Sequence, residues 1–85
     1  GNIHLSLRAP QGMSREDWVA RAGEADMVVN EIAVALGGSF SAEHGIGRLK
    51  VAELERYASP VELDLMRAVK RAFDPNGILN PGTVL

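Results

Sequence analysis

Apolar and polar residues alternate strictly near the start of the chain, from Asn2 to Arg8. The apolar side chains of this segment are Ile3, Leu5 and Leu7, and the polar ones are Asn2, His4, Ser6 and Arg8. A period of two is typical of a β-strand with one buried and one solvated face. Pro10 and Gly12 then interrupt the pattern. The sequence therefore predicts a strand over residues 2–8, with His4 on its polar face.

A longer segment with helical periodicity follows. Apolar residues recur in it at steps of three and four, which predicts one buried stripe along a helix. They are Trp18, Ala22, Ala25, Val29, Ile32, Ala33 and Leu36. Ser14 stands before the segment as an N-cap, and Asp17 occupies the acidic position of a capping box. Gly37 and Gly38 follow, and glycine readily adopts the left-handed conformation that ends helices. We expect a helix from about Arg15 to Leu36.

The remaining segments predict a second strand, two helices and a tail. Residues 39–44 directly follow the glycine pair, which suits a strand and completes a strand–helix–strand unit. A helix is expected from about Arg48 to Tyr57. Ser59-Pro60-Val61-Glu62 combines an N-cap serine, a proline at the first helical position and a glutamate at the third. This signal predicts another helix over residues 60–73, followed by an extended tail over residues 78–85. The predicted fold class is α+β.

The helix over residues 60–73 should have one buried and one solvated face. Apolar residues at helical spacing predict the buried face, and they are Leu65, Met66, Val69, Ala72 and Phe73. The basic residues Arg67, Lys70 and Arg71 are expected to face solvent and to suit the negative end of the helix dipole.

Composition and charge narrow the classes of function. The chain has 85 residues, 46% of them hydrophobic, and a net charge of −2. These values describe one small globular domain without the basic face that nucleic-acid binding requires. No segment approaches the ~20 apolar residues of a membrane span, and the absence of cysteine excludes a disulfide framework. With no signal peptide visible, the expected compartment is cytoplasmic. Because the first residue is Gly1 and not methionine, we expect a piece of a larger protein.

Most residues suited to chemistry lie between Ser39 and Arg48. Glu43 and His44 are neighbours, and in an extended backbone their side chains would point to opposite faces and serve two sites. Gly45 and Gly47 allow a sharp turn or a close approach to a ligand, and the expected helix start beyond them favours an anion. The residues alone fit catalysis and also fit a polar turn that leads into a helix.

Four separated stretches together resemble a known family. They are Gly1-Asn2-Ile3-His4, the stretch from Gly37 to Gly47, Ser59-Pro60, and the stretch from Asp74 to Gly82. In their order and approximate spacing they are similar to the C-terminal end of FAD-linked oxidases of the vanillyl-alcohol oxidase type, in particular the D-2-hydroxyacid dehydrogenase group. The resemblance covers nearly the whole chain. It implies the last part of a longer flavoenzyme, inactive by itself, that oxidises a small D-2-hydroxy acid to the 2-oxo acid.

The resemblance also implies how the chain divides. Residues 1–47 would form the C-terminal half of a cap domain, an antiparallel sheet that faces the flavin and has helices behind it. Residues 48–85 would supply helices and a tail that pack on an upstream FAD-binding domain of the same polypeptide.

Several site residues follow from the same resemblance. Metal-dependent members hold a divalent cation such as zinc, manganese or iron with two histidines and a glutamate. His4 and Glu43 match two of these ligands, and the remaining histidine would fall just before Gly1. His44 matches the general base that takes the hydroxyl proton of the substrate. Asn80 is an implied flavin contact, and Asn2 is placed near the same site.

Two positions depart from the family pattern. Ser6 stands where hydroxyglutarate-type members commonly have an asparagine, and Thr83 replaces the usual lysine after Asn80-Pro81-Gly82. Two non-enzymatic hypotheses stay open: a small anion-binding module, and an interaction domain that dimerises through the Trp18 stripe. As an isolated piece, the chain is expected to expose a sheet edge and apolar faces, which favour self-association.

Overall fold

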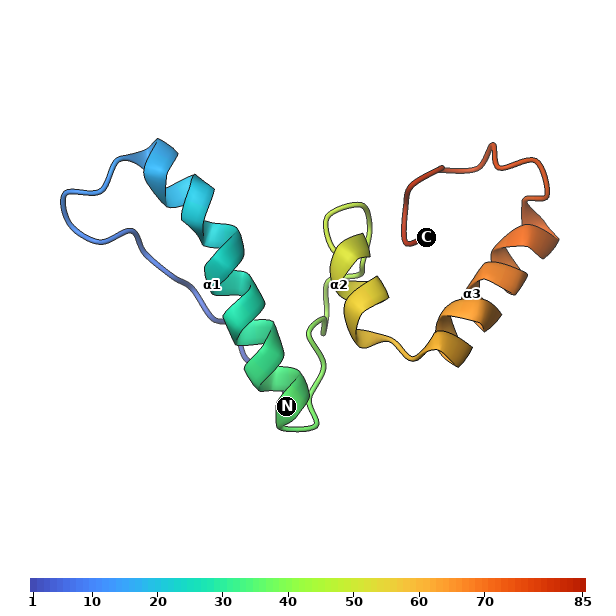
Figure 1. Ribbon diagram of the computed structural model, residues 1–85, viewed down its shortest axis with the longest axis horizontal. Helices are drawn as coiled ribbons and strands as arrows, with labels where there is room; N and C mark the ends of the chain where they lie inside the picture. Colours follow the sequence, from blue (N-terminus) through green and yellow to red (C-terminus); the bar gives the residue numbers. More distant parts are fainter. The chain divides into compact units, whose positions relative to one another are not determined.

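A computed structural model describes all 85 residues and contains three helices. They are α1 (Arg15–Ala35), α2 (Val51–Tyr57) and α3 (Pro60–Phe73), drawn in Figure 1. The chain forms two compact units, Gly1–Glu43 and His44–Leu85, called here the first and the second unit. α1 belongs to the first unit, and α2 and α3 belong to the second. No helix is long and apolar enough to cross a membrane.

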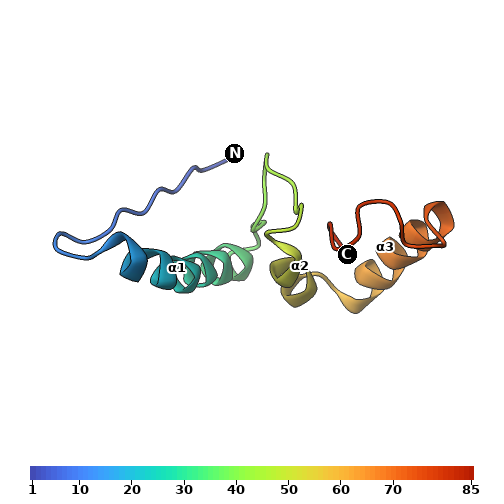
Figure 2. The same ribbon diagram turned by 90° about the horizontal axis from the view of Figure 1, so that it is seen from above.

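The prediction of an antiparallel sheet was wrong, because the structure contains no strand. Residues 1–10 form an extended arm that turns near Pro10, where the Met13 N–H donates to the Pro10 carbonyl at 3.2 Å, and α1 follows (Figure 2). In the second predicted strand, the Ser39 hydroxyl donates to the Ser41 carbonyl at 2.6 Å and accepts from the Ser41 N–H at 3.3 Å. Such local bonds compete with a strand ladder. Alternation shows which residues suit a strand, but a strand also needs a hydrogen-bonded neighbour.

α1 starts and ends close to the predicted bounds. The Ser14 hydroxyl accepts from the Asp17 N–H at 3.1 Å, so the predicted N-cap is confirmed. At the other end Gly37 has a φ of 77°, and the Gly38 N–H donates to the Ala33 carbonyl at 2.8 Å. The left-handed glycine thus lets the chain fold back onto the last helical carbonyls.

The predicted stripe of α1 lies on its less exposed face but is only half-buried, and the predicted stripe of α3 is largely wrong. α1 has no buried residue, and Leu36 is 82% exposed. In α3, Phe73 is 80% exposed, whereas Leu63, which lies outside the predicted stripe, is buried. Together with Leu54 of α2, Leu63 makes up the whole buried apolar set. Periodicity identifies the face that can be buried, but full burial requires an opposing apolar surface that covers the whole face, and the rest of the chain covers these faces only in part.

α3 has the predicted bounds because its first turn is fixed locally. The Ser59 hydroxyl accepts from the Glu62 N–H at 3.2 Å, and the Ser59 N–H donates to the Glu62 carboxylate at 2.9 Å. This is a complete capping box, with Pro60 at the first helical position. α2 lacks such a signal: its N-cap, Lys50, makes no side-chain cap bond. The helix accordingly begins at Val51, three residues later than predicted.

The predicted tail over residues 78–85 is docked on α3. Asp74, 9% exposed, caps α3 and accepts the N–H groups of Ile78 at 2.9 Å and Leu79 at 2.8 Å. Gly77, which lies between Asp74 and Ile78 in the sequence, has a φ of 63°. The chain therefore reverses directly after α3 and returns along it, as the orange and red segments of Figure 1 show.

Candidate functional site

The first unit brings together two predicted metal ligands. His4 Nε2 contacts Glu43 Oε1, although 39 positions separate the two residues. His4 comes from the extended arm, and Glu43 lies in the bend that follows the Ser39–Ser41 turn. Both side chains are exposed, His4 at 69% and Glu43 at 55%. The contact therefore lies at the surface, where a ligand from outside the chain can reach both side chains.

The donor set of this pair is chemically suited to a divalent cation but incomplete. Imidazole nitrogen and carboxylate oxygen are ordinary ligands of zinc, manganese and iron. No group of three or more His, Asp or Glu side chains that could hold a metal ion occurs in the chain. The 85 residues thus supply two donors of such a site, with Asn2 exposed two positions before His4.

His44, the predicted base, is the first residue of the second unit and is exposed. It follows Glu43 directly, so their Cα atoms lie about 3.8 Å apart across the peptide bond. Residues 42–44 form a bend and not a strand, so the strand argument for opposite side-chain directions does not apply. A turn begins three residues beyond His44 at Gly47, whose φ is 54°. That conformation is easy for glycine and costly for other residues.

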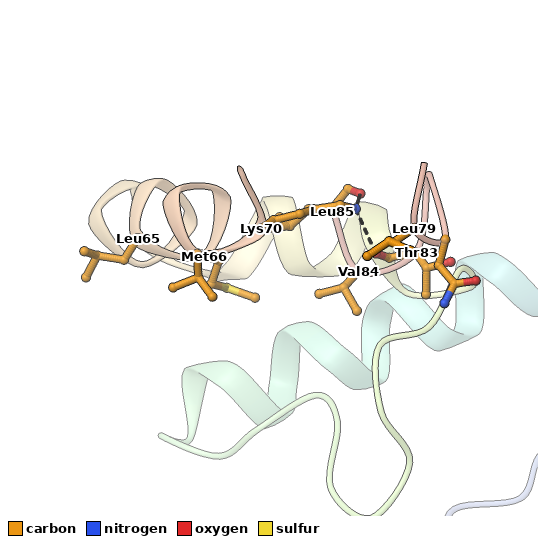
Figure 3. A pocket seen from close by; sticks show the side chains of 9 residues that line it. Leu65, Met66, Lys70, Leu79, Thr83, Val84 and Leu85 are labelled. Carbon is orange, nitrogen blue, oxygen red and sulfur yellow. Dashed lines mark hydrogen bonds between the residues drawn. The ribbon is translucent and has the colours of Figure 1, made fainter. Parts of the chain in front are cut away.

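The second unit contains an apolar groove between α3 and the tail, shown in Figure 3. Its volume is about 560 Å³. Leucine, valine and methionine side chains form most of its wall, and the full lining is Leu65, Met66, Val69, Lys70, Leu79, Asn80, Thr83, Val84 and Leu85. Asn80, the predicted flavin contact, is therefore one of the few polar groups in an apolar groove. Its φ of 45° lies in the left-handed region, which asparagine tolerates.

Sequence reasoning missed the role of Lys70. It was expected to face solvent, but its ammonium donates to the Leu85 carbonyl at 2.6 Å and to the Thr83 carbonyl at 3.4 Å, as Figure 3 shows. The available signal was its spacing, because Lys70 follows Met66 by four residues and so shares its helix face. Arg48 was missed as well: its Nε donates to the Thr83 hydroxyl at 3.3 Å.

Two carboxylates have pKa values shifted by the fold. The backbone N–H groups of Leu79 and Ile78 hold the pKa of Asp74 below its ordinary value. The backbone N–H of Ser59, and then its hydroxyl, lower the pKa of Glu62. In both cases hydrogen bonds stabilise the charged form. Both groups fix the ends of α3, so their electrostatics serve the fold.

Comparison with known families adds to this geometry. Residues 1–84 match the family described as FAD linked oxidases, C-terminal domain. The chain therefore belongs to this family, and the resemblance noted from its motifs is confirmed. Membership identifies it as a domain of FAD-linked oxidoreductases. The comparison with solved structures found no match.

Curated relatives support the same assignment. A D-2-hydroxyglutarate dehydrogenase of Stutzerimonas stutzeri (strain A1501) is 42% identical over 84 residues, which are 99% of this chain and 18% of the relative. A D-lactate dehydrogenase of Archaeoglobus fulgidus is 41% identical over 100% of this chain and 18% of the relative. The glycolate oxidase subunit GlcD of Escherichia coli (strain K12) is 48% identical over 96% of this chain and 16% of the relative. The chain thus spans less than a fifth of the length of these relatives.

Proposed function

We propose that the chain supplies part of the substrate site of an FAD-dependent enzyme that oxidises a small D-2-hydroxy acid to the 2-oxo acid. The observation that carries this proposal is the contact between His4 and Glu43 immediately before His44. Two metal donors are in contact, and the residue that follows Glu43 in the sequence is a histidine, in a chain of the FAD linked oxidase family. The hydroxy acids in the names of the relatives support the substrate class.

His4 and Glu43 would hold a divalent cation, with further ligands from outside the 85 residues. Both donors are exposed, so these ligands can reach them. Such a cation would supply positive charge, which would favour loss of the proton from the substrate hydroxyl. Glu43 also brings negative charge, which offsets part of the positive charge of the ion.

His44 would act as the general base. Its imidazole takes the proton of the substrate hydroxyl as the C–H bond of the α-carbon breaks. Imidazole suits this role because its ordinary pKa of about 6.5 lies close to neutral pH. FAD, when bound, supplies the acceptor for the two electrons that leave with the hydride.

Asn80 would contact the flavin, and Asn2 would lie near the same site. The amide of Asn80 offers both a donor and an acceptor within the apolar groove of the second unit, which suits the mixed apolar and polar edge of a flavin ring. Residues 1–47 would belong to the substrate domain and residues 48–85 to the segment that packs on an upstream FAD-binding domain. Exposed apolar side chains support such packing: Ile3 is 89% exposed, Leu49 is 93% exposed and Ile78 is 74% exposed.

The decisive test is the visible absorption spectrum of the full-length polypeptide, recorded anaerobically with a panel of D-2-hydroxy acids, with and without a chelator. We expect one acid to bleach the flavin band, and metal removal to prevent the bleaching. A colourless protein, or a flavin that no member of the panel reduces, would overturn the proposal.

Two variants distinguish a metal role of Glu43 from the general effect of removing a negative charge at the surface. Glu43→Gln keeps the shape of the side chain but removes its charge, so bleaching should become slow and insensitive to the chelator. Glu24→Gln makes the same chemical change on the surface of α1, where Glu24 forms only a loose 3.8 Å ion pair with Arg21. This control should behave like the unmodified protein, and equal effects of the two changes would argue against a metal role for Glu43.

A further inference from the structure

The end of the tail is bonded to the turn that follows His44. The Val84 N–H donates to the Gly47 carbonyl at 2.7 Å. One residue away on each segment, Arg48 Nε donates to the Thr83 hydroxyl at 3.3 Å. These four residues, 47–48 and 83–84, are called here the tail–turn junction. Both bonds lie within the second unit, and Gly47 is only three positions after His44.

The tail side of the junction is itself held against α3. Lys70 donates to the carbonyls of Thr83 and Leu85, which flank Val84 (Figure 3). Asp74 fixes the beginning of the tail through the N–H groups of Ile78 and Leu79. The tail is therefore anchored to α3 at both ends, and the junction transfers this anchoring to the turn over residues 47–50.

Backbone conformation shows that the junction is a constrained structure and not a loose chain end. Val84 has a φ of 70°. A β-branched residue is strongly disfavoured in this region and adopts it only where the surroundings impose it. Val84 and Thr83 are both partly buried. Val84 itself donates the 2.7 Å bond to Gly47, and Lys70 binds the backbone oxygens on both sides of it.

We propose that the tail–turn junction positions the segment that carries His44, and that Thr83 is a positioning residue of the enzyme. Its hydroxyl accepts a hydrogen bond from Arg48. Valine has the same shape but cannot accept this bond, whereas serine can. Lysine is only a donor and would add a second cation beside Arg48. The expected effect on catalysis rests on the proposed role of His44, whereas the effect on the junction does not.

The test uses Thr83→Val, Thr83→Lys and Thr83→Ser in the full-length flavoprotein. The first readout is amide hydrogen exchange at Val84, measured by mass spectrometry with fragmentation to single residues. We expect exchange about fivefold faster in Thr83→Val, which corresponds to the loss of one ordinary hydrogen bond, and faster still in Thr83→Lys. Thr83→Ser should restore the original rate. Unchanged exchange in both Thr83→Val and Thr83→Lys would overturn the junction.

The second readout is the rate of anaerobic flavin reduction at saturating substrate, compared with the substrate concentration that gives half of that rate. A positioning role predicts a several-fold lower maximal rate in Thr83→Val, little change in the half-saturating concentration, and recovery in Thr83→Ser. Faster exchange with an unchanged maximal rate would overturn the positioning role. If no D-2-hydroxy acid reduces the unmodified protein, the proposed function fails, and exchange at Val84 still decides whether the junction exists.

Discussion

The two glycines that follow His44 should respond in opposite ways to the same substitution. A Cβ added at Gly45 or at Gly47 meets no heavy atom within 4 Å, so neither change to alanine causes a clash. The difference is conformational, because only Gly47 has a φ in the left-handed region, at 54°. Gly47→Ala should therefore cost roughly 1–2 kcal/mol of backbone strain, reduced by about 0.4–1 kcal/mol because alanine also restricts the unfolded chain. For Gly45→Ala only the second, stabilising effect applies.

The free energies of opening the turn should thus differ by about 1–2 kcal/mol between the two variants, a factor of roughly 5–30 in population. Two amides report this opening, because the Val84 N–H donates to the Gly47 carbonyl and the Lys50 N–H donates to the Ile46 carbonyl. Their hydrogen exchange should accelerate in Gly47→Ala but not in Gly45→Ala. Gly47→Asn should lie between them, since asparagine tolerates the left-handed region. Equal acceleration in both alanine variants would refute the conformational argument.

Two further changes probe the stability of each unit. Gly23 lies inside α1, and a Cβ added to it meets no heavy atom within 4 Å. Gly23→Ala should therefore stabilise the helix by roughly 0.5–1 kcal/mol. Circular dichroism on heating should show a higher helix content, and a loss of helix would contradict this expectation. Asp74 has a lowered pKa, so its stabilising effect is fully present above the ordinary pKa of about 3.9 and is lost as the pH falls through the lower, folded value. Urea unfolding between pH 6 and pH 2 should show this loss, and Asp74→Asn should be less stable at pH 6 and less sensitive to acid; parallel pH profiles would refute it.

Local signals in the sequence predicted the helices well. The start of α3 was predictable because Ser59, Pro60 and Glu62 interact within one turn, and the end of α1 was predictable because Gly37 adopts its preferred conformation where expected. The sheet was not predictable in this way. Strand pairing depends on residues far apart in sequence, and the alternation of Ile3 and Leu5 indicates a preference without supplying a partner strand.

The candidate site shows the same division. Family resemblance singled out His4 and Glu43, and the structure brings them into contact. Family resemblance could not reveal that Lys70 donates to the backbone of the tail or that the Thr83 hydroxyl accepts a hydrogen bond from Arg48. Both contacts depend on the path of the tail after Asp74. The sequence indicated where α3 ends and that a tail follows, but not that the chain reverses at Gly77 or where the tail meets the preceding turn.

The tail–turn junction also determines how the second unit becomes ordered. The bonds that fix both ends of α3 join residues three to five positions apart, whereas the Arg48 and Thr83 side chains that meet are 35 positions apart. Closing the longer loop costs roughly 2 kcal/mol more in chain entropy, by the logarithmic dependence on loop length. The junction can offset this cost only when the intervening helices already hold its two segments near each other. The order of the turn beyond His44 is therefore a collective property of residues 47–84, so a substitution far from His44 can disorder this turn while leaving each helix intact.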